Sequence, residues 1–404
     1  MRIAIVSGDD IVGDDPQQLS AALAARGDEV TGFVRCMGRR AAEASTNGHR
    51  TVSVPVGPRK AKSVSEVLPY VGDWAGGLAR EWEAEPPDVV HAYGWLGGLA
   101  AQLAARRREV PTVQSFLGLA ATGGPHASQE SERLRIEPLL ARSATWVTGE
   151  SSDDVDALSR LRRSRARVSA LTSGVDVERY NSSGPALART DMHRILGLAP
   201  KPLPCNGFDI VIRALPRVPN AELVVAENEP TNRQHNEARA GLQHLAVELG
   251  VGERVRFAGN VAGDELPMLL RSADVVVCTP RQPPRATAVL QAMASGVVVV
   301  AFGVGVLKDA VVDNVTGLLL SPETPAGLSS LLRNLLAQSF QCESMGAAGR
   351  SRAVSRYAWE RIALDSLNIY QLVGAPVGPR NGCSDRASGD AMMTAGKAFW
   401  ERQL

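Results

Sequence analysis

The chain has 404 residues, of which 44% are hydrophobic and 22% are charged, and its formal net charge is +1. This length allows two domains of ordinary size, and the balanced charge gives no general attraction to nucleic acid or to anionic membranes. Aromatic residues make up only 4% of the chain, so platforms for base stacking are not expected. We therefore expect a globular protein with no nucleic-acid partner.

The cysteines and the start of the chain bear on its location. The five cysteines are odd in number and widely spaced, with none in a C-x-x-C pair, so we expect neither a disulfide framework nor a structural zinc site. Met1 leads directly into the strand-like Arg2–Val6, so no signal peptide is expected. The chargeless stretch 286–307 is long enough to span a bilayer but contains polar residues and glycines, which favours a helix followed by a strand. We predict a cytoplasmic protein and leave peripheral membrane binding open.

The first half of the chain alternates short apolar runs with helical patterns. This alternation is typical of a doubly wound parallel α/β sheet and predicts a first domain over residues 1–180. The predicted strands are 3–6, 29–34, 52–56, 89–91, 110–116, 146–148 and 168–171, and the predicted helices are 16–26, 63–85, 96–107, 130–142 and 153–163.

The pattern breaks in a polar segment, 181–189, that contains Ser182-Ser183-Gly184-Pro185 and is predicted to be a linker. The alternation then resumes and predicts a second α/β domain over 190–355, followed by a helix over 356–373. Residues 374–404 are rich in Gly, Pro, Ser and Asn at their start and are predicted to be a flexible tail. The predicted strands of the second half are 221–226, 255–257, 273–277, 297–301 and 318–320, and the predicted helices are 209–215, 237–249, 264–271, 326–338 and 345–373.

The stretch 278–302 is predicted to be a loop, a helix and a buried strand. Pro283 and Pro284 are expected to open the helix, and Val289, Leu290 and Met293 lie on one face of it. Because a strand that ends in a loop before a helix N-terminus is where parallel sheets bind phosphates, this stretch is the predicted ligand site.

Three segments carry a resemblance to a known family: DELPMLLRSADVVV (264–277), LQAMASGVVVVA (290–301) and DAVVDNVTGLLL (309–320). They are similar to the C-terminal half of family 4 glycosyltransferases of the GT-B fold. The resemblance implies two Rossmann-like domains that face a cleft, an acceptor-side domain (1–180) and a nucleotide-sugar-side domain (190–355), with 356–373 crossing back to the first. It further implies a retaining, metal-independent transfer of a hexose from a UDP- or GDP-sugar to an acceptor that could be a small molecule, a glycan or a lipid.

The residues at the family's donor-binding positions differ from the usual ones. The family carries two glutamates eight positions apart, which here become Pro283 and Gln291. In its Gly-Arg-Leu-x-x-x-Lys-Gly loop, Lys201 stands for the arginine and Asn206 for the lysine, while Gly207 remains. Lys201 keeps the positive charge of the family's arginine but lacks its bidentate guanidinium, and Asn206 lacks the charge of the family's lysine. Gly207 still allows backbone N–H groups to face a phosphate. A rigid loop with three prolines and no ligand is the alternative.

Further donor-side candidates lie near the helix start. Arg281 and Arg285 could bind phosphate from a new direction, or they could be surface arginines without a ligand. Thr287 is a further donor-binding candidate, and the Gln291 amide can still accept one hydrogen bond from a ribose hydroxyl. Loss of two charge-assisted contacts would lower donor affinity by roughly 10²- to 10⁴-fold if nothing compensates.

The first domain departs from the family as well. The first loop, Gly8–Asp15, contains four aspartates, which suggest a metal but are more typical of a solvated turn, so no metal site is predicted. His91 matches the first histidine of a His-Ala-His stretch and is the candidate catalytic residue, with a structural role as the alternative. A family histidine near the acceptor is replaced by Leu117.

These losses leave more than one function open. The favoured hypothesis is a glycosyltransferase, and the alternative is a non-catalytic GT-B protein that supports a true transferase as its partner or senses a sugar nucleotide. A phosphorylase or an epimerase on the same fold is the third hypothesis. Five arginines between 160 and 167 could meet a lipid headgroup or an anionic acceptor, although the aspartates just upstream favour a self-paired, solvated helix face.

Overall fold

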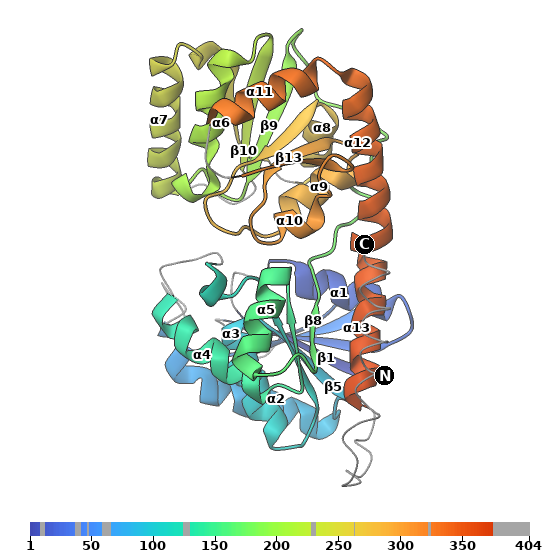
Figure 1. Ribbon diagram of the computed structural model, residues 1–404. Helices are drawn as coiled ribbons and strands as arrows, with labels where there is room; N and C mark the ends of the chain where they lie inside the picture. Colours follow the sequence, from blue (N-terminus) through green and yellow to red (C-terminus); the bar gives the residue numbers. More distant parts are fainter. Residues whose placement is uncertain are drawn as a thin grey trace. The chain divides into compact units, whose positions relative to one another are not determined.

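The computed structural model describes residues 1–8, 13–36, 42–46, 48–58, 66–123, 130–227, 232–261, 263–321 and 325–374. Met1–Val373 form one compact unit, and the predicted tail after Gly374 lies outside the described residues. The unit contains two separate sheets, each covered by helices on both faces (Figure 1).

The first sheet has eight strands in the order β3-β4-β2-β1-β5-β6-β7-β8 among the described residues. All neighbours are parallel except β3 and β4. The strands are β1 (Arg2–Ser7), β2 (Glu29–Cys36), β3 (Ala42–Thr46), β4 (His49–Pro55), β5 (Val89–Tyr93), β6 (Thr112–Phe116), β7 (Trp146–Gly149) and β8 (Val168–Ala170).

Two helical layers bury this sheet, as its continuous apolar strands require. Helices α2 to α5 share one hydrophobic core with one face of the sheet, while α1 and α13 share a second core with the other face (Figure 1). These helices are α1 (Asp15–Ala24), α2 (Val71–Ala84), α3 (Trp95–Arg106), α4 (Glu130–Ser143), α5 (Ser152–Arg162) and α13 (Trp359–Gly374).

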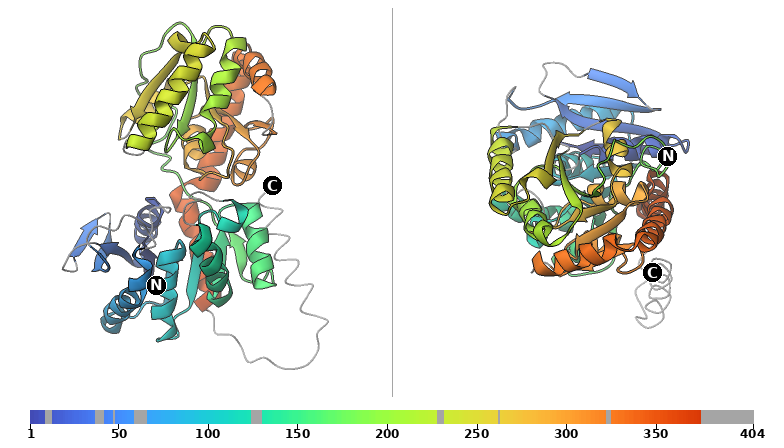
Figure 2. Two further views of the ribbon diagram at one scale, coloured as in Figure 1. Left: turned by 90° about the vertical axis from the view of Figure 1, so that its left-hand side faces the viewer. Right: turned by 90° about the horizontal axis from the view of Figure 1, so that it is seen from above.

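The second sheet is six-stranded and parallel, in the order β11-β10-β9-β12-β13-β14. Its strands are β9 (His193–Ala199), β10 (Ala221–Glu227), β11 (Val255–Asn260), β12 (Val275–Cys278), β13 (Val298–Phe302) and β14 (Gly317–Leu320). Helices α6, α7 and α11 pack on one face, and α8, α9 and α10 pack on the other; in the left view of Figure 2, α6 and α7 (green and yellow) face the viewer. The helices are α6 (Phe208–Ala214), α7 (Arg233–Glu248), α8 (Glu265–Arg271), α9 (Thr287–Ala294), α10 (Leu307–Ala310), α11 (Pro325–Leu336) and α12 (Ser339–Arg352).

The end of the second domain is joined to the first sheet by a nearly continuous helical run. Helix α12 passes through one π-helical segment, Ala353–Tyr357, into α13. Trp359 packs on Gly174, where an added Cβ would lie 2.5 Å from the indole ring. Tyr370 is fully buried beside β1 and β5, so α13 belongs to the core of the first domain.

The structure corrects the sequence reading of β9, the strand that lies near the middle of the second sheet. No strand was predicted over 193–199, because the charged Arg194 and the glycine Gly197 interrupt its apolar pattern. Arg194 is nevertheless buried, since its Nε donates to Glu222 Oε1 at 2.7 Å and its Nη1 donates to Ser272 Oγ at 2.8 Å. Gly197 leaves room for the ring of Phe208, which would lie 2.9 Å from an added Cβ.

Two other elements differ from the sequence analysis. The antiparallel edge strand β3 was not predicted. The prolines Pro283 and Pro284 do not open α9, which begins at Thr287. Pro283 instead packs against Gly305, where an added Cβ would lie 2.6 Å from the proline Cβ. The chargeless stretch 286–307 forms α9 and β13, as predicted, and no helix among the described residues is long and apolar enough to cross a membrane.

Candidate functional site

The candidate site lies at the carboxyl ends of the parallel strands, where α/β sheets bind ligands. In the second domain, β9 ends in the loop of Lys201 to Gly207, and β12 ends in the loop that leads to α9. In the first domain, Glu150 follows β7 at the same kind of edge.

The Lys201 loop is built around Gly207. Gly207 has a φ of +71°, and an added Cβ would lie 1.8 Å from the carbonyl oxygen of Thr279. Its carbonyl accepts a hydrogen bond from Thr279 Oγ1 at 2.9 Å. Only glycine allows this approach of the two loops. The Gly207 N–H donates to Pro204 O at 3.2 Å, so the donors of this turn that remain for a phosphate belong to the residues after it.

Two predicted donor-site residues hold these loops together. Asn206 Nδ2 donates to the Lys201 carbonyl at 2.8 Å and closes the loop on itself. Arg281 donates through both Nη atoms to the Asp209 carboxylate, at 2.8 and 2.7 Å, and Nη1 also donates to Pro204 O at 2.6 Å. The guanidinium of Arg281 is therefore anchored by a carboxylate in the first turn of α6. Lys201 is half-buried in the loop that joins β9 to α6.

Gln291 lies in the middle of α9 and is buried. Its Nε2 donates to Tyr180 Oη at 3.1 Å, whereas its Oε1 is buried and has no hydrogen-bond partner among the described residues. A buried acceptor without a donor is unfavourable, so this oxygen is suited to receive a hydroxyl of a ligand. Thr287, one turn earlier, is half-buried at the start of the same helix.

Arg285 joins the two domains through a buried polar network. Its Nε lies 3.1 Å from Glu150 Oε2, and its Nη2 lies 2.6 Å from Asp15 Oδ2. Ser173 Oγ lies 2.7 Å from Asp15 Oδ2 and 2.9 Å from Glu150 Oε1. The side chain of Arg285 is only 14% exposed, so its interpretation as a surface arginine was wrong.

The carboxylates of this network also differ from the sequence prediction. Asp15 was placed in a solvated turn, which was wrong, because it is buried beside Arg285; Asp9 and Asp10 lie outside the described residues. Burial raises the pKa of Asp15, although Arg285 opposes this shift. Burial by itself would lower the pKa of Arg285, but Glu150 and Asp15 more than offset it, so the guanidinium stays charged.

The domains also cap each other's helices. Glu150 Oε1 of the first domain accepts the Ala286 N–H, at the start of α9, at 3.3 Å. Asp309 of the second domain accepts the Ser152 N–H, at the start of α5, at 2.7 Å, and also accepts from Ser152 Oγ at 2.9 Å. Each carboxylate therefore lies at the positive end of a helix that belongs to the other domain. None of these carboxylate partners was predicted, because each pair is more than 130 residues apart in the chain.

His91 lies in the core of the first domain. Its Nδ1 is 2.6 Å from Tyr370 Oη, and its Nε2 is 2.6 Å from Ser115 Oγ. The ring stacks on Tyr93 with 4.5 Å between centroids, and burial lowers the pKa of His91 to about 3. Both nitrogens are thus engaged by the protein, and the geometry favours the structural role for this histidine.

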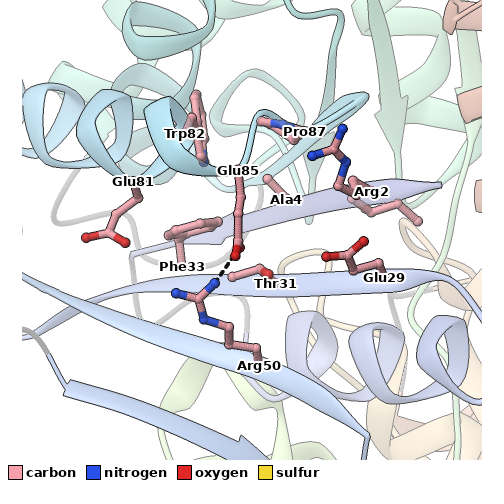
Figure 3. Close-up of a pocket in the computed structure, with 11 residues that line it drawn as sticks. Arg2, Ala4, Glu29, Thr31, Phe33, Arg50, Glu81, Trp82, Glu85 and Pro87 are labelled. Atoms are coloured by element: carbon pink, nitrogen blue, oxygen red, sulfur yellow. Dashed lines mark hydrogen bonds and ion pairs between the residues drawn. The ribbon is translucent and has the colours of Figure 1, made fainter.

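Two hollows in the first domain differ in their relation to the strand ends. The larger, of about 360 Å³, is bordered by Arg2 and Glu29 at the amino ends of β1 and β2, and Arg50 donates to Glu85 at 2.6 Å within it (Figure 3). Parallel sheets bind ligands at the opposite, carboxyl ends, so this hollow is not the candidate site. The smaller, of about 220 Å³, lies at the carboxyl ends of β5 and β6. It is lined by Gly94, Trp95, Phe116, Leu117, Gly118, Arg133 and Glu137.

Comparison with known proteins supplies the family. The family model described as "Glycosyl transferases group 1" matches residues 201–352, and the model described as "Glycosyl transferase 4-like domain" matches residues 12–174. A D-inositol 3-phosphate glycosyltransferase of Stackebrandtia nassauensis is 30% identical over 377 residues, which cover 87% of this chain and 84% of the relative. The chain belongs to the family 4-like glycosyltransferases of the GT-B fold. A second relative of this glycosyltransferase, from Xylanimonas cellulosilytica and with the same name, is 29% identical over 380 residues, covering 87% of this chain and 89% of the relative.

Solved structures share the fold of this glycosyltransferase. Sucrose-phosphate synthase from Thermosynechococcus elongatus superposes with a TM-score of 0.78 at 22% identity, over 92% of this chain and 98% of the other. Anabaena Alr3699/HepE in complex with UDP and glucose superposes with a TM-score of 0.71 at 17% identity, over 92% and 100% of the two chains. The predicted fold, two Rossmann-like α/β domains of GT-B type, is confirmed, and glycosyl transfer is favoured over the non-catalytic alternative.

Proposed function

We propose that this glycosyltransferase transfers a hexose from a nucleotide-diphosphate sugar to a hydroxyl of its acceptor, with retention of the anomeric configuration. The donor lies at the carboxyl edge of the second sheet, against the residues Lys201, Asn206, Gly207, Arg281, Arg285, Thr287 and Gln291. The observation that carries the proposal is the buried Gln291 Oε1, which lacks a donor among the described residues and occupies the position where the family binds the ribose hydroxyls.

The nature of the donor is supported by solved relatives of the fold. Anabaena Alr3699/HepE is described in complex with UDP, with UDP and glucose, and with UDP-glucose. UDP-glucose is therefore the first donor to test, with GDP-mannose as the alternative base and sugar. The curated relatives are named for D-inositol 3-phosphate, which makes this molecule the first acceptor to test.

The residues present assign different roles to the cations of the site. The leaving diphosphate needs positive charge or N–H donors close to it. Arg281 is held by Asp209 and Arg285 by Asp15 and Glu150, so these guanidiniums are partly neutralised before a donor arrives. Lys201 and backbone N–H groups at the start of α6 are proposed to bind the diphosphate together with them. Because a diphosphate oxygen can itself assist the acceptor hydroxyl, the proposed reaction requires neither a protein nucleophile nor a metal ion.

Calorimetry with purified protein tests the donor site. UDP-glucose, UDP, GDP-mannose and GDP are titrated in the presence and absence of EDTA, and we expect micromolar binding of one nucleotide series that EDTA does not change. Lys201→Ala and Gln291→Ala should each lower donor affinity or turnover by about tenfold or more. Gln243→Ala serves as the control, because Gln243 is exposed on α7.

The outcomes separate the residue assignments from the function. Unchanged donor binding in both Lys201→Ala and Gln291→Ala would remove these residues from the site while leaving glycosyl transfer intact. If no nucleotide binds at millimolar concentration, the proposed donor class is wrong.

A further inference from the structure

The outward face of helix α4 carries exposed leucines next to arginines. Leu139 is 60% exposed and Leu134 is 47% exposed, and Arg135 and Arg142 are exposed beside them. Positions 134, 135, 139 and 142 lie on one side of a helix. The opposite side is occupied by Leu140 and by other buried residues that pack on the sheet, so the exposed leucines are not needed for the core.

Neighbouring helices extend this face. Gln102 Nε2 on α3 donates to Leu140 O on α4 at 3.3 Å, and Arg142 Nε on α4 donates to Leu161 O on α5 at 3.1 Å. These bonds place the last turns of α3, α4 and α5 side by side, as Figure 1 shows for the three helices. Next to these bonds, α3 presents Leu103, which is 40% exposed. We name the exposed residues Leu103, Leu134, Leu139, Arg106, Arg135 and Arg160 the leucine–arginine surface.

The arginines of this surface are not held in ion pairs with described residues. Within the described part of the chain, no carboxylate forms an ion pair with Arg106, Arg135 or Arg160. Two acidic side chains on neighbouring elements pair with other arginines, Asp156 with Arg165 and Glu83 with Arg108. The self-paired helix face expected from the sequence is therefore realised only for Arg165. Arg106, Arg135 and Arg160 therefore present three exposed guanidinium groups on this surface.

We propose that the leucine–arginine surface binds the face of an anionic phospholipid bilayer. Exposed leucines next to arginines on neighbouring helices match a bilayer interface, where the leucines enter the acyl boundary and the guanidiniums bind lipid phosphates. A nucleic acid would use the arginines but would gain nothing from the three leucines. The proposal concerns the first domain alone and does not depend on the proposed donor. It places the glycosyltransferase at the membrane surface, within reach of acceptors that carry a lipid.

Vesicle sedimentation of the full chain tests this proposal. The probe is large vesicles of phosphatidylcholine alone or with 30 mol% phosphatidylglycerol at about 0.1 M salt. We expect binding only to the anionic vesicles, and weaker binding at about 0.5 M salt because of screening. Arg135→Glu should lower the partition coefficient by about fivefold or more, since each basic residue near an anionic surface contributes about a fivefold factor. Leu139→Asp should lower it at least as much.

The matched control is Val247→Asp on α7 of the second domain, where Val247 is an exposed apolar residue outside the surface. This variant should bind vesicles like the unmodified chain, and circular dichroism checks that all three variants are folded. Absence of binding to anionic vesicles overturns the proposal, as does binding that Arg135→Glu and Leu139→Asp leave unchanged. Binding to single-stranded RNA that Arg135→Glu reduces, without vesicle binding, would also overturn it and would identify a nucleic acid as the partner.

Discussion

The buried position of Arg285 allows a quantitative prediction. Arg285→Met removes the guanidinium but keeps most of the apolar stem, and it leaves Glu150 and Asp15 without their cation. The Glu150 side chain is only 2% exposed, so its charge cannot be satisfied by solvent in this arrangement. Removal of one partner of a buried ion pair typically costs about 3–5 kcal/mol. We expect the free energy of unfolding to fall by an amount in this range.

Arg281→Met is the matched control in the same loop. The Arg281 side chain is 44% exposed and pairs with Asp209, and exposed ion pairs contribute about 0–1 kcal/mol. A double-mutant cycle with Glu150→Gln isolates the coupling, because Arg285→Met should be less harmful once Glu150 has no charge. The double variant is therefore expected to be more stable than the sum of the two single losses predicts.

The pH dependence of the Arg285→Met variant has a definite sign. Burial raises the pKa of Asp15 even with Arg285 present, and removal of the cation raises it further. A carboxyl group whose pKa is higher in the folded than in the unfolded state destabilises the fold fully above its folded pKa. This penalty decreases as the pH falls below the folded pKa and is absent below the unfolded pKa. The loss caused by Arg285→Met should thus be larger at pH 8 than at pH 5.

Urea unfolding followed by tryptophan fluorescence and circular dichroism measures these losses at both pH values. The reasoning is refuted if Arg285→Met costs less than about 1 kcal/mol, as an exposed pair would. It is also refuted if the double-mutant cycle shows no coupling between Arg285 and Glu150.

Three further predictions follow from single residues. His91 has a pKa of about 3 in the folded state, so between about pH 6.5 and 3 only the unfolded state binds the extra proton. The free energy of unfolding should therefore fall by up to about 1.4 kcal/mol for each pH unit of acidification. His91→Gln should reduce this pH dependence, as measured by urea unfolding. Gly207→Ala should destabilise by more than the about 1–3 kcal/mol of its backbone strain, because the added Cβ would lie 1.8 Å from Thr279 O; Gly259→Ala, at a φ of +70° with nothing within 4 Å, should show the strain alone. Gln291→Met removes an unpaired buried oxygen but also the bond to Tyr180 Oη, so the stability of the ligand-free protein should change by less than about 1 kcal/mol. The variant should nevertheless weaken donor binding in calorimetry, and a larger loss of stability would contradict this account.

Much of the fold could be predicted because local sequence patterns determine it. Runs such as Val275–Cys278 and Val298–Phe302 are apolar throughout, as strands buried on both faces must be. The strand β9 could not be predicted in this way, because Arg194 is tolerated only through Glu222 and Ser272, which are distant in the chain. Periodicity records which side chains are apolar, but it does not record which buried charges have partners.

The candidate site could be predicted only in part, for the same reason. The Lys201 loop and Gln291 could be located from the resemblance, since their positions in the chain are fixed relative to neighbouring core motifs. The partners of Arg285 could not, because Asp15 precedes it by 270 residues and Glu150 by 135. A sequence shows that Arg285 is charged, whereas only the packed chain shows whether that charge faces a ligand or the protein itself.

The exchange of helix caps between the domains has a consequence for their motion. Hydrogen bonds weaken steeply with distance, so a small separation of the domains would break the bond from Ala286 to Glu150 and the bond from Ser152 to Asp309 together. The N–H groups at both helix starts and both carboxylates would then have to form hydrogen bonds with water at the same time. The two domains should therefore have two main arrangements, one with both caps formed and one with both broken, and few intermediate states. Substrate entry should depend on how often both caps break.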